Sequence, residues 1–144
     1  MRSEGETIMK LRTIKIFFGA AFILFAAAIF ASAQTKKVNV SFKTGATGGD
    51  YSNTVAGNGS VDYYITAKAG QRMSAKLTSA NSSLYFLVTK SGGTESIADD
   101  ARDATEWSGD LPDNGTYVVR VYLFRNAART NKKPVSFKIR FDVN

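Results

Sequence analysis

Two arginines near the C-terminus have the residue type and spacing best suited to binding. Arg125 and Arg129 flank the short segment Asn126-Ala127-Ala128. One helical turn there would place residues i and i+4 on the same face, so both guanidinium groups would project together. A guanidinium is a planar fork that pairs with a carboxylate through two hydrogen bonds. The pattern predicts a loop that recognises an acidic surface. The alternative is an Arg125 paired within the fold and an Arg129 that is only solvated.

The residue inventory argues against catalysis. The chain of 144 residues has no His and no Cys, which excludes a histidine-activated nucleophile and any disulfide. Four acids lie close together at Asp99, Asp100, Asp103 and Glu106, whereas glycoside hydrolysis needs two carboxylates held rigidly across a cleft. A solvated acidic loop is the preferred interpretation, and a calcium site is the alternative. The sequence therefore predicts a protein that is not an enzyme and needs no cofactor.

The first 33 residues have the pattern of a secretory signal peptide. Basic residues at Lys10, Arg12 and Lys15 precede an apolar run at 16–30, and Ala31-Ser32-Ala33 is a small-residue cleavage site. An uncleaved anchor is the alternative, although a membrane span needs about 20 apolar residues. Translation can start at either Met1 or Met9. We expect a mature domain at 34–144, periplasmic or secreted, with no stable membrane association after cleavage.

The predicted mature chain is basic at its C-terminal end. From Gln34 onward, 15 Lys and Arg stand against 10 Asp and Glu, a net charge of +5. Seven of the acids lie between Glu95 and Asp113, and seven of the bases lie after Val119. Such a basic end suits an acidic cleft or an anionic envelope polymer. The leader argues against a nucleic-acid partner.

After the leader, apolar residues alternate with polar ones, which is typical of half-buried strands. The alternating runs lie around 38–42, 61–67, 73–77, 84–88, 118–124 and 137–141. Glycine-rich turn signals such as Thr47-Gly48-Gly49-Asp50 and Gly57-Asn58-Gly59 separate them. We predict an all-β domain, a single antiparallel β-sandwich of about seven or eight strands. Trp107 and Tyr117 are predicted core aromatics, and Ser96 to Glu106 has no strand pattern.

Several short motifs resemble the periplasmic inhibitors of goose-type (g-type) lysozyme. The main ones are Leu111-Pro112-x-x-Gly115-x-Tyr117 and, directly after the next strand, Arg125-Asn126-x-Ala128-Arg129. Weaker matches occur at Tyr51-Ser52, at Gly57 and at Ala67 to Gln71. The resemblance implies a β-sandwich that plugs the cleft of a g-type lysozyme and protects the bacterial cell wall. It also implies that Arg129 reaches the cleft while Arg125 and Asn126 shape the loop.

The chain departs from that family's pattern in a second contact element, formed by Tyr51 and the residue after Gly57. The family has a tyrosine after this glycine, whereas this chain has Asn58. The family also favours Y-S-G where Tyr51-Ser52-Asn53 stands here. Losing an aromatic anchor weakens an interface roughly tenfold or more.

Two of the motifs are also similar to those of bacterial pre-peptidase C-terminal-like domains, which are β-sandwich accessory modules. That resemblance implies the alternative function, an envelope-binding module without inhibitory activity. The sequence does not indicate an oligomeric state.

Overall fold

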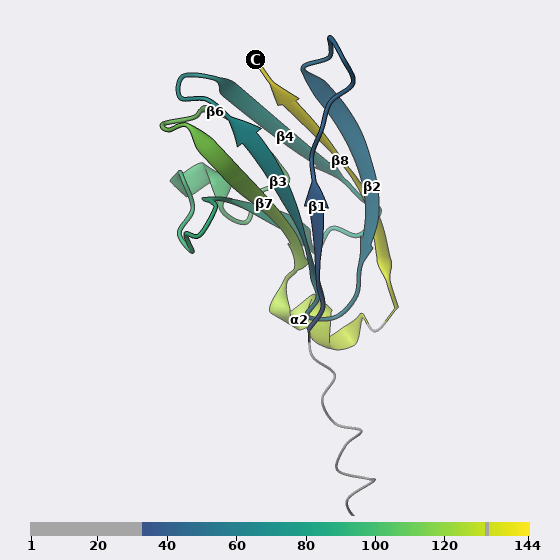
Figure 1. The fold of residues 1–144 in the computed structure, drawn as a ribbon. Coiled ribbons are helices and arrows are strands. Elements are labelled where there is room, and N and C mark those ends of the chain that lie inside the picture. The colour runs from purple at the N-terminus through teal and green to yellow at the C-terminus, as the bar shows by residue number, and fades with distance from the viewer. Residues whose placement is uncertain (1–32, 132) are drawn as a thin grey trace, which may run out of the picture. The chain divides into compact units, whose positions relative to one another are not determined.

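The computed structural model describes residues 33–131 and 133–144, which fold into a two-layer β-sandwich (Figure 1). One sheet has the strand order β1-β3-β7-β5 and the other the order β2-β8-β4-β6. The strands are β1 (Thr35–Asn39), β2 (Gly48–Val55), β3 (Ser60–Ala67), β4 (Arg72–Thr78), β5 (Leu84–Lys90), β6 (Glu106–Asp110), β7 (Gly115–Leu123) and β8 (Val135–Val143). Two short helices complete this part of the chain, η1 (Asp99–Ala101) and α2 (Arg125–Thr130). The all-β prediction is confirmed.

The predicted leader falls almost wholly outside the described residues, which begin at Ala33. Among the helices within 33–131 and 133–144, none has the length and apolar character needed to cross a membrane.

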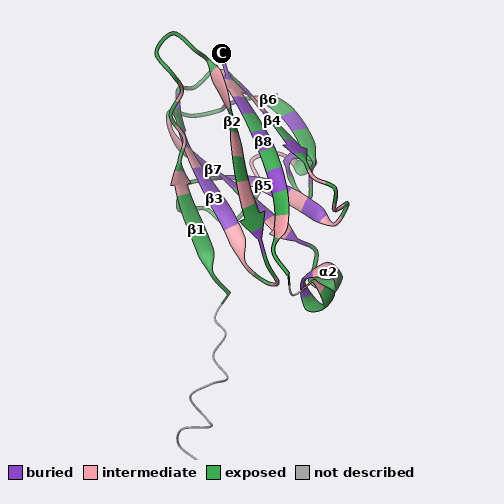
Figure 2. Ribbon diagram, turned by 90° about the vertical axis from the view of Figure 1, so that its right-hand side faces the viewer, coloured by how far each residue is buried: buried purple, intermediate pink, exposed green. Residues whose placement is uncertain are grey.

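The period of two in the sequence places one face of each sheet in a shared core. Along β4 and β8 buried residues alternate with more exposed ones, as the banding in Figure 2 shows, and β3 departs from this only at Asp62, which is buried as well. Side chains from both sheets meet between the layers, and the largest fully buried ones include Tyr63, Phe86, Tyr117, Ile139 and Phe141. Because the domain has no disulfides, apolar burial must supply most of its stability, at about 25 cal/mol per Å² of surface removed from water.

One strand pairing departs from the antiparallel prediction. β1 runs parallel to β3, with Thr35 opposite Ser60 and Asn39 opposite Tyr64, whereas every other pairing between named strands is antiparallel. The chain leaves β1, crosses to β2 in the other sheet, and returns to β3 through the turn at 56–59. Two reversals of direction make β3 run the same way as β1.

The structure also corrects the expected turn at Thr47-Gly48-Gly49-Asp50. Three of these residues form the beginning of β2, with Gly48 opposite Asp142 of β8. A Cβ at Gly48 would lie only 2.0 Å from the Asp142 Oδ1 atom. This glycine therefore allows a close approach of two strands and does not mark a loop.

The acidic segment before β6 closes one side of the sandwich. Ala101 and Ala104 are buried, and isolated bridges join this segment to β5. Trp107 is 5% exposed and its Nε1 donates a hydrogen bond to Asp100 Oδ1 at 3.0 Å. The prediction of Trp107 as a core aromatic is confirmed. Within the described part of the chain, no three acidic side chains are grouped so that they could hold a metal ion.

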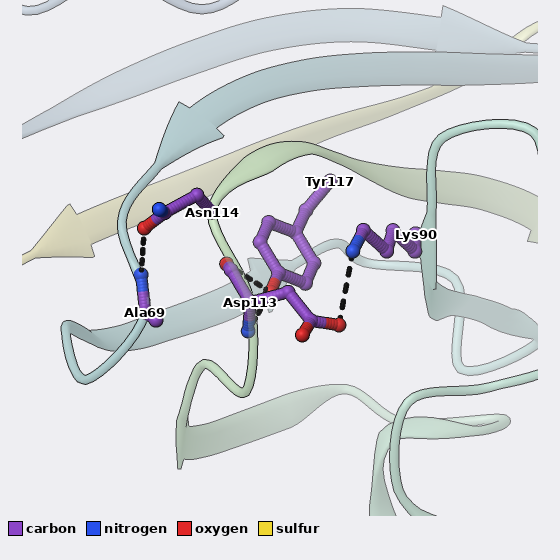
Figure 3. Close-up of polar contacts among 5 residues, drawn as sticks. All are labelled: Ala69, Lys90, Asp113, Asn114 and Tyr117. Atoms are coloured by element: carbon purple, nitrogen blue, oxygen red, sulfur yellow. Dashed lines mark hydrogen bonds and ion pairs between the residues drawn. The ribbon is translucent and has the colours of Figure 1, made fainter.

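The Leu-Pro-x-x-Gly-x-Tyr motif anchors the start of β7 (Figure 3). The fully buried Tyr117 donates a hydrogen bond through its hydroxyl to the Asp113 carbonyl at 2.7 Å and accepts one from the Asp113 N–H at 3.0 Å. The Ala69 N–H donates to Asn114 Oδ1 at 2.8 Å, and Lys90 pairs with Asp113. These contacts hold the end of β7 that lies farthest from α2, so the motif has a structural role and fixes the strand that carries the arginine helix.

Replacing Tyr63 by phenylalanine should stabilise the domain. The ring lies edge-on to Tyr51 and Phe137, and the buried hydroxyl has no hydrogen-bond partner in the described residues. The Asn53 side chain lies nearby and lowers the Tyr63 pKa, as an amide N–H donor would, but it forms no hydrogen bond of normal geometry with the hydroxyl. Since an unsatisfied buried hydroxyl is costly, Tyr63→Phe should raise the free energy of unfolding by about 1 kcal/mol in urea titrations at pH 7. A loss of stability would show that the hydroxyl has a partner.

The same variant should alter the alkaline limit of stability. Burial raises the pKa of Tyr63 from 10.0 to about 12, against a smaller lowering by the Asn53 side chain. Between these two values the unfolded chain loses the tyrosine proton before the folded chain does, so wild-type stability falls as pH rises. Tyr63→Phe should fall less steeply over that range. Equal slopes for the two proteins would contradict the assignment.

Candidate functional site

The predicted helical turn between Arg125 and Arg129 is present as α2, which connects β7 to β8 and so joins the two sheets (Figure 2). The residue before its N-cap, Leu123, and its fourth residue, Ala128, are both buried in the core, the positions of a hydrophobic staple. The Phe124 N–H donates to the Ser83 carbonyl at 3.1 Å, and the Ala128 N–H donates to the Phe124 carbonyl at 2.8 Å. The first turn of α2 is therefore fixed to the core and to the loop before β5.

The end of α2 is held by Asn131. Its backbone N–H and its side-chain Nδ2 both donate to the Ala127 carbonyl, at 2.7 and 3.0 Å. Its own carbonyl accepts a hydrogen bond from the Gly57 N–H at 3.3 Å. Gly57 has a φ of +54°, which favours glycine, and lies in the turn that carries Asn58. The fold thus brings the Asn58 turn and the arginine helix together at one end of the sandwich.

The side chains at this end are available to a partner. Arg125, Asn126, Arg129 and Asn58 are all exposed. Neither arginine takes part in an ion pair within the described residues, whereas Arg72, Lys76, Lys90, Arg120 and Arg140 do. In this structure the alternative of an internally paired Arg125 is therefore not seen. Two unpaired guanidinium groups on a fixed helix form a basic site suited to carboxylates.

Tyr51 lies away from this end. It is half-buried in β2, and its ring packs near those of Tyr63 and Phe141. Its hydroxyl donates to the Ser41 carbonyl at 2.7 Å and accepts from the Ser41 N–H at 3.0 Å. Tyr51 lies four residues before the end of β2, which corresponds to about 13 Å of extended strand. The structure gives it a clear packing role, and its contact with a partner stays a prediction.

Phe124 is a surface residue that sequence reasoning missed. It is 43% exposed, the one large hydrophobic side chain so exposed among the described residues. Its ring centroid lies 4.4 Å from that of Tyr85 on the neighbouring strand. Alternation along β7 could have found it, because Tyr117, Val119, Val121 and Leu123 are buried and position 124 falls on the opposite face with Arg120 and Tyr122.

Arg120 differs from the two arginines of α2 because it is already paired. Its Nε and Nη2 atoms donate to the two carboxylate oxygens of Asp62, each at 2.7 Å. Asp62 is 2% exposed. The hydrogen bond to Asp62 is the main cause of a raised Arg120 pKa. This pair ties β3 to β7 and is part of the scaffold.

Comparison with known proteins gives a curated relative that inhibits g-type lysozyme. The chain matches no protein-family model. It is 31% identical over 104 residues to the inhibitor of g-type lysozyme of Escherichia coli (strain K12), a match that spans 69% of this chain and 76% of that protein.

Solved structures agree with this match. The PliG protein of Aeromonas hydrophila, described as a periplasmic lysozyme inhibitor of g-type lysozyme, has a TM-score of 0.69 at 28% identity, covering 78% of this chain and 100% of its own. A mutant of Escherichia coli PliG has a TM-score of 0.62 at 25% identity, with 78% and 100% covered. These relatives are inhibitor proteins and not enzymes, as expected from the absence of His and Cys. This chain belongs to the family of g-type lysozyme inhibitors.

Proposed function

We propose that this protein inhibits a g-type lysozyme in the periplasm by placing the arginine end of its sandwich in the active-site cleft. The observation that carries the proposal is the pair of exposed, unpaired arginines on α2 in a chain of this family. The helix is held at both ends by backbone hydrogen bonds. A preorganised loop loses little conformational entropy on binding, so more of its contact energy appears as affinity.

The mechanism is steric exclusion combined with charge pairing. A glycoside hydrolase cleft holds at least one carboxylate beside the bond that it cleaves. A guanidinium inserted there would occupy the space of the glycan and form charge-assisted hydrogen bonds with that carboxylate. We assign the inserted group to Arg129, and we assign Arg125 and Asn126 to shaping the contact around it.

The second contact element implied by the family resemblance is the turn at Gly57, and here that turn carries the polar side chain of Asn58. Its turn lies beside α2, because the Gly57 N–H donates to the Asn131 carbonyl. A tyrosine at this exposed position would add an apolar ring at the edge of the cleft. Asn58→Tyr should therefore strengthen inhibition roughly tenfold, a gain in line with the energies of aromatic anchors.

The direct test is a panel of lysozymes. Residues 34–144 would be mixed with a g-type, a c-type and an i-type lysozyme, and the lysis of cell-wall suspensions would be followed. We expect inhibition of the g-type enzyme only. The double variant Arg125→Ala/Arg129→Ala is the matched control, because both side chains are exposed and unpaired. If wild type and Asn58→Tyr both fail against several g-type lysozymes, the proposal is wrong and glycan or envelope binding becomes the function to test.

We further propose that the leader is removed before the protein acts. The compact unit that includes the sandwich begins at Ala33, next to the predicted cleavage site. Intact-mass spectrometry of protein from a periplasmic fraction should give a chain that begins at Gln34. A mass that includes residues 16–33 would indicate a retained anchor.

A further inference from the structure

An aromatic surface adjoins the arginine helix, with one exposed ring, that of Phe124, between two half-buried tyrosines. It consists of Tyr85, Tyr122, Phe124 and Arg125, and we call it the Phe124 surface. Phe124 is the residue directly before α2, and its ring packs on that of Tyr85, with the ring planes tilted by 57°. Phe124, Tyr122 and Arg125 line one shallow hollow, together with Ser83 and Asp103. An apolar ring left in water beside an unpaired arginine is a combination that protein interfaces favour.

The hollow has a fixed shape on both sides. The backbone of Phe124 is bonded to Ser83, which holds the ring over β5. On the far side the Tyr122 hydroxyl donates to the Asp103 carboxylate. Burial is the first cause of a raised pKa for Tyr122, so this hydroxyl stays protonated at physiological pH. A partner would meet a preformed hollow with an apolar wall and a cation at its rim.

A stable interface needs a larger contact area than the surface around Arg129 alone provides. A standard interface buries about 800 Å² on each partner, from roughly 20–30 residues. The exposed residues of α2 and of the Asn58 turn are too few to supply that area, so the surface next to α2 must contribute. Arg125, which belongs to the Phe124 surface, lies about one helical turn from Arg129. The separation is about 6 Å along the helix axis. A lysozyme that accepts Arg129 would therefore reach the Phe124 surface.

We infer that the Phe124 surface is a second anchor for the same g-type lysozyme, receiving an apolar side chain from the rim of the enzyme's cleft. This inference rests on the proposed function. Phe124 supplies the apolar contact and Tyr85 supports its ring from below. Arg125, with no ion pair in the described residues, would face a carboxylate or a carbonyl at that rim.

The test compares variants that each remove one aromatic side chain. Dissociation constants for a g-type lysozyme would be measured by calorimetry for wild type, Phe124→Ala and Tyr64→Ala. Tyr64 is the matched control, a half-buried tyrosine on the same outer sheet face, about 13 Å along β3 from the end that carries α2. We expect Phe124→Ala to weaken binding about tenfold or more and Tyr64→Ala to change it by less than about twofold.

A photo-crosslinking residue provides a readout that does not depend on stability. Benzoylphenylalanine at position 124 should crosslink to the lysozyme, and the same residue at position 64 should not. If wild type binds but Phe124→Ala binds equally well and position 124 does not crosslink, the inference is wrong while the proposed function stands. If wild type binds no g-type lysozyme, the proposed function is wrong and the inference is wrong with it. A crosslink from position 124 only to a second copy of this chain would also overturn the inference.

Discussion

Arg129→Ala should weaken inhibition of a g-type lysozyme about a hundredfold and change the free energy of unfolding by about 0.5 kcal/mol or less. A hundredfold loss corresponds to about 2.7 kcal/mol, within the range for a charged residue desolvated at an interface. The folded protein should hardly change, because Arg129 is exposed and makes no ion pair within the described residues. Inhibition constants from lysis assays and urea unfolding curves would give the two numbers.

Two further variants sharpen this result. Lys133→Ala removes an exposed cation near the same end, outside α2. If inhibition depends on a positive charge at position 129 and not on the overall positive charge of this end, Lys133→Ala should change inhibition less than about threefold. Arg129→Lys should restore little, because an ammonium group cannot form the planar two-point contact. Equal losses for Arg129→Ala and Lys133→Ala would mean that general basicity causes the binding. Recovery by lysine would contradict a bidentate pairing.

Arg120→Ala should be the most destabilising substitution of an exposed residue, at about 2–3 kcal/mol. Asp62 is almost completely buried, and Arg120 bonds both of its carboxylate oxygens. Removing the arginine leaves a buried charge without a partner, which typically costs 3–5 kcal/mol. The estimate is reduced here because the Arg120 side chain is 50% exposed and water can enter the space that it leaves. Urea unfolding at pH 7 measures the change.

The matched control for this pair is Lys90→Ala. Lys90 pairs with Asp113 at 2.9 Å, but both side chains are largely exposed, so the loss should stay below about 1 kcal/mol. The double variant Asp62→Val/Arg120→Val should be more stable than Arg120→Ala, since no charge is then left buried. If the double variant is the less stable of the two, the ion pair itself and not the orphaned carboxylate determines the cost.

The sequence was most informative where one face of a strand is buried, because a period of two follows directly from that burial. The strands around 61–67, 73–77 and 137–141 were predicted for this reason, and each is present in the structure. The helical turn at Arg125 to Arg129 was also predicted from local spacing. The placement of Asn58 beside it was not derivable in this way, because a bond between Gly57 and Asn131 depends on how two sheets pack.

The errors have physical causes as well. Gly48 and Gly49 suggested a turn because glycine usually signals chain reversal, but here Gly48 makes room for the side chain of Asp142. The parallel pairing of β1 leaves no local signature, since alternation is the same in parallel and antiparallel edge strands. Phe124 was counted as the last residue of a strand with apolar residues on both faces, and its place on the outer face, opposite the buried Leu123, was overlooked.

The parallel β1 has a practical consequence for attaching the protein to a surface. Because Thr35 pairs with Ser60, the start of β1 lies at the end of the sandwich that carries α2 (Figure 1). The C-terminus lies at the opposite end, where Asn144 exchanges backbone hydrogen bonds with Arg72. A bead, sensor chip or fusion partner joined through Gln34 would crowd the two arginines. The same support joined through Asn144 would leave them facing the solution, so the orientation of the tether alone should decide how much lysozyme an immobilised sample captures.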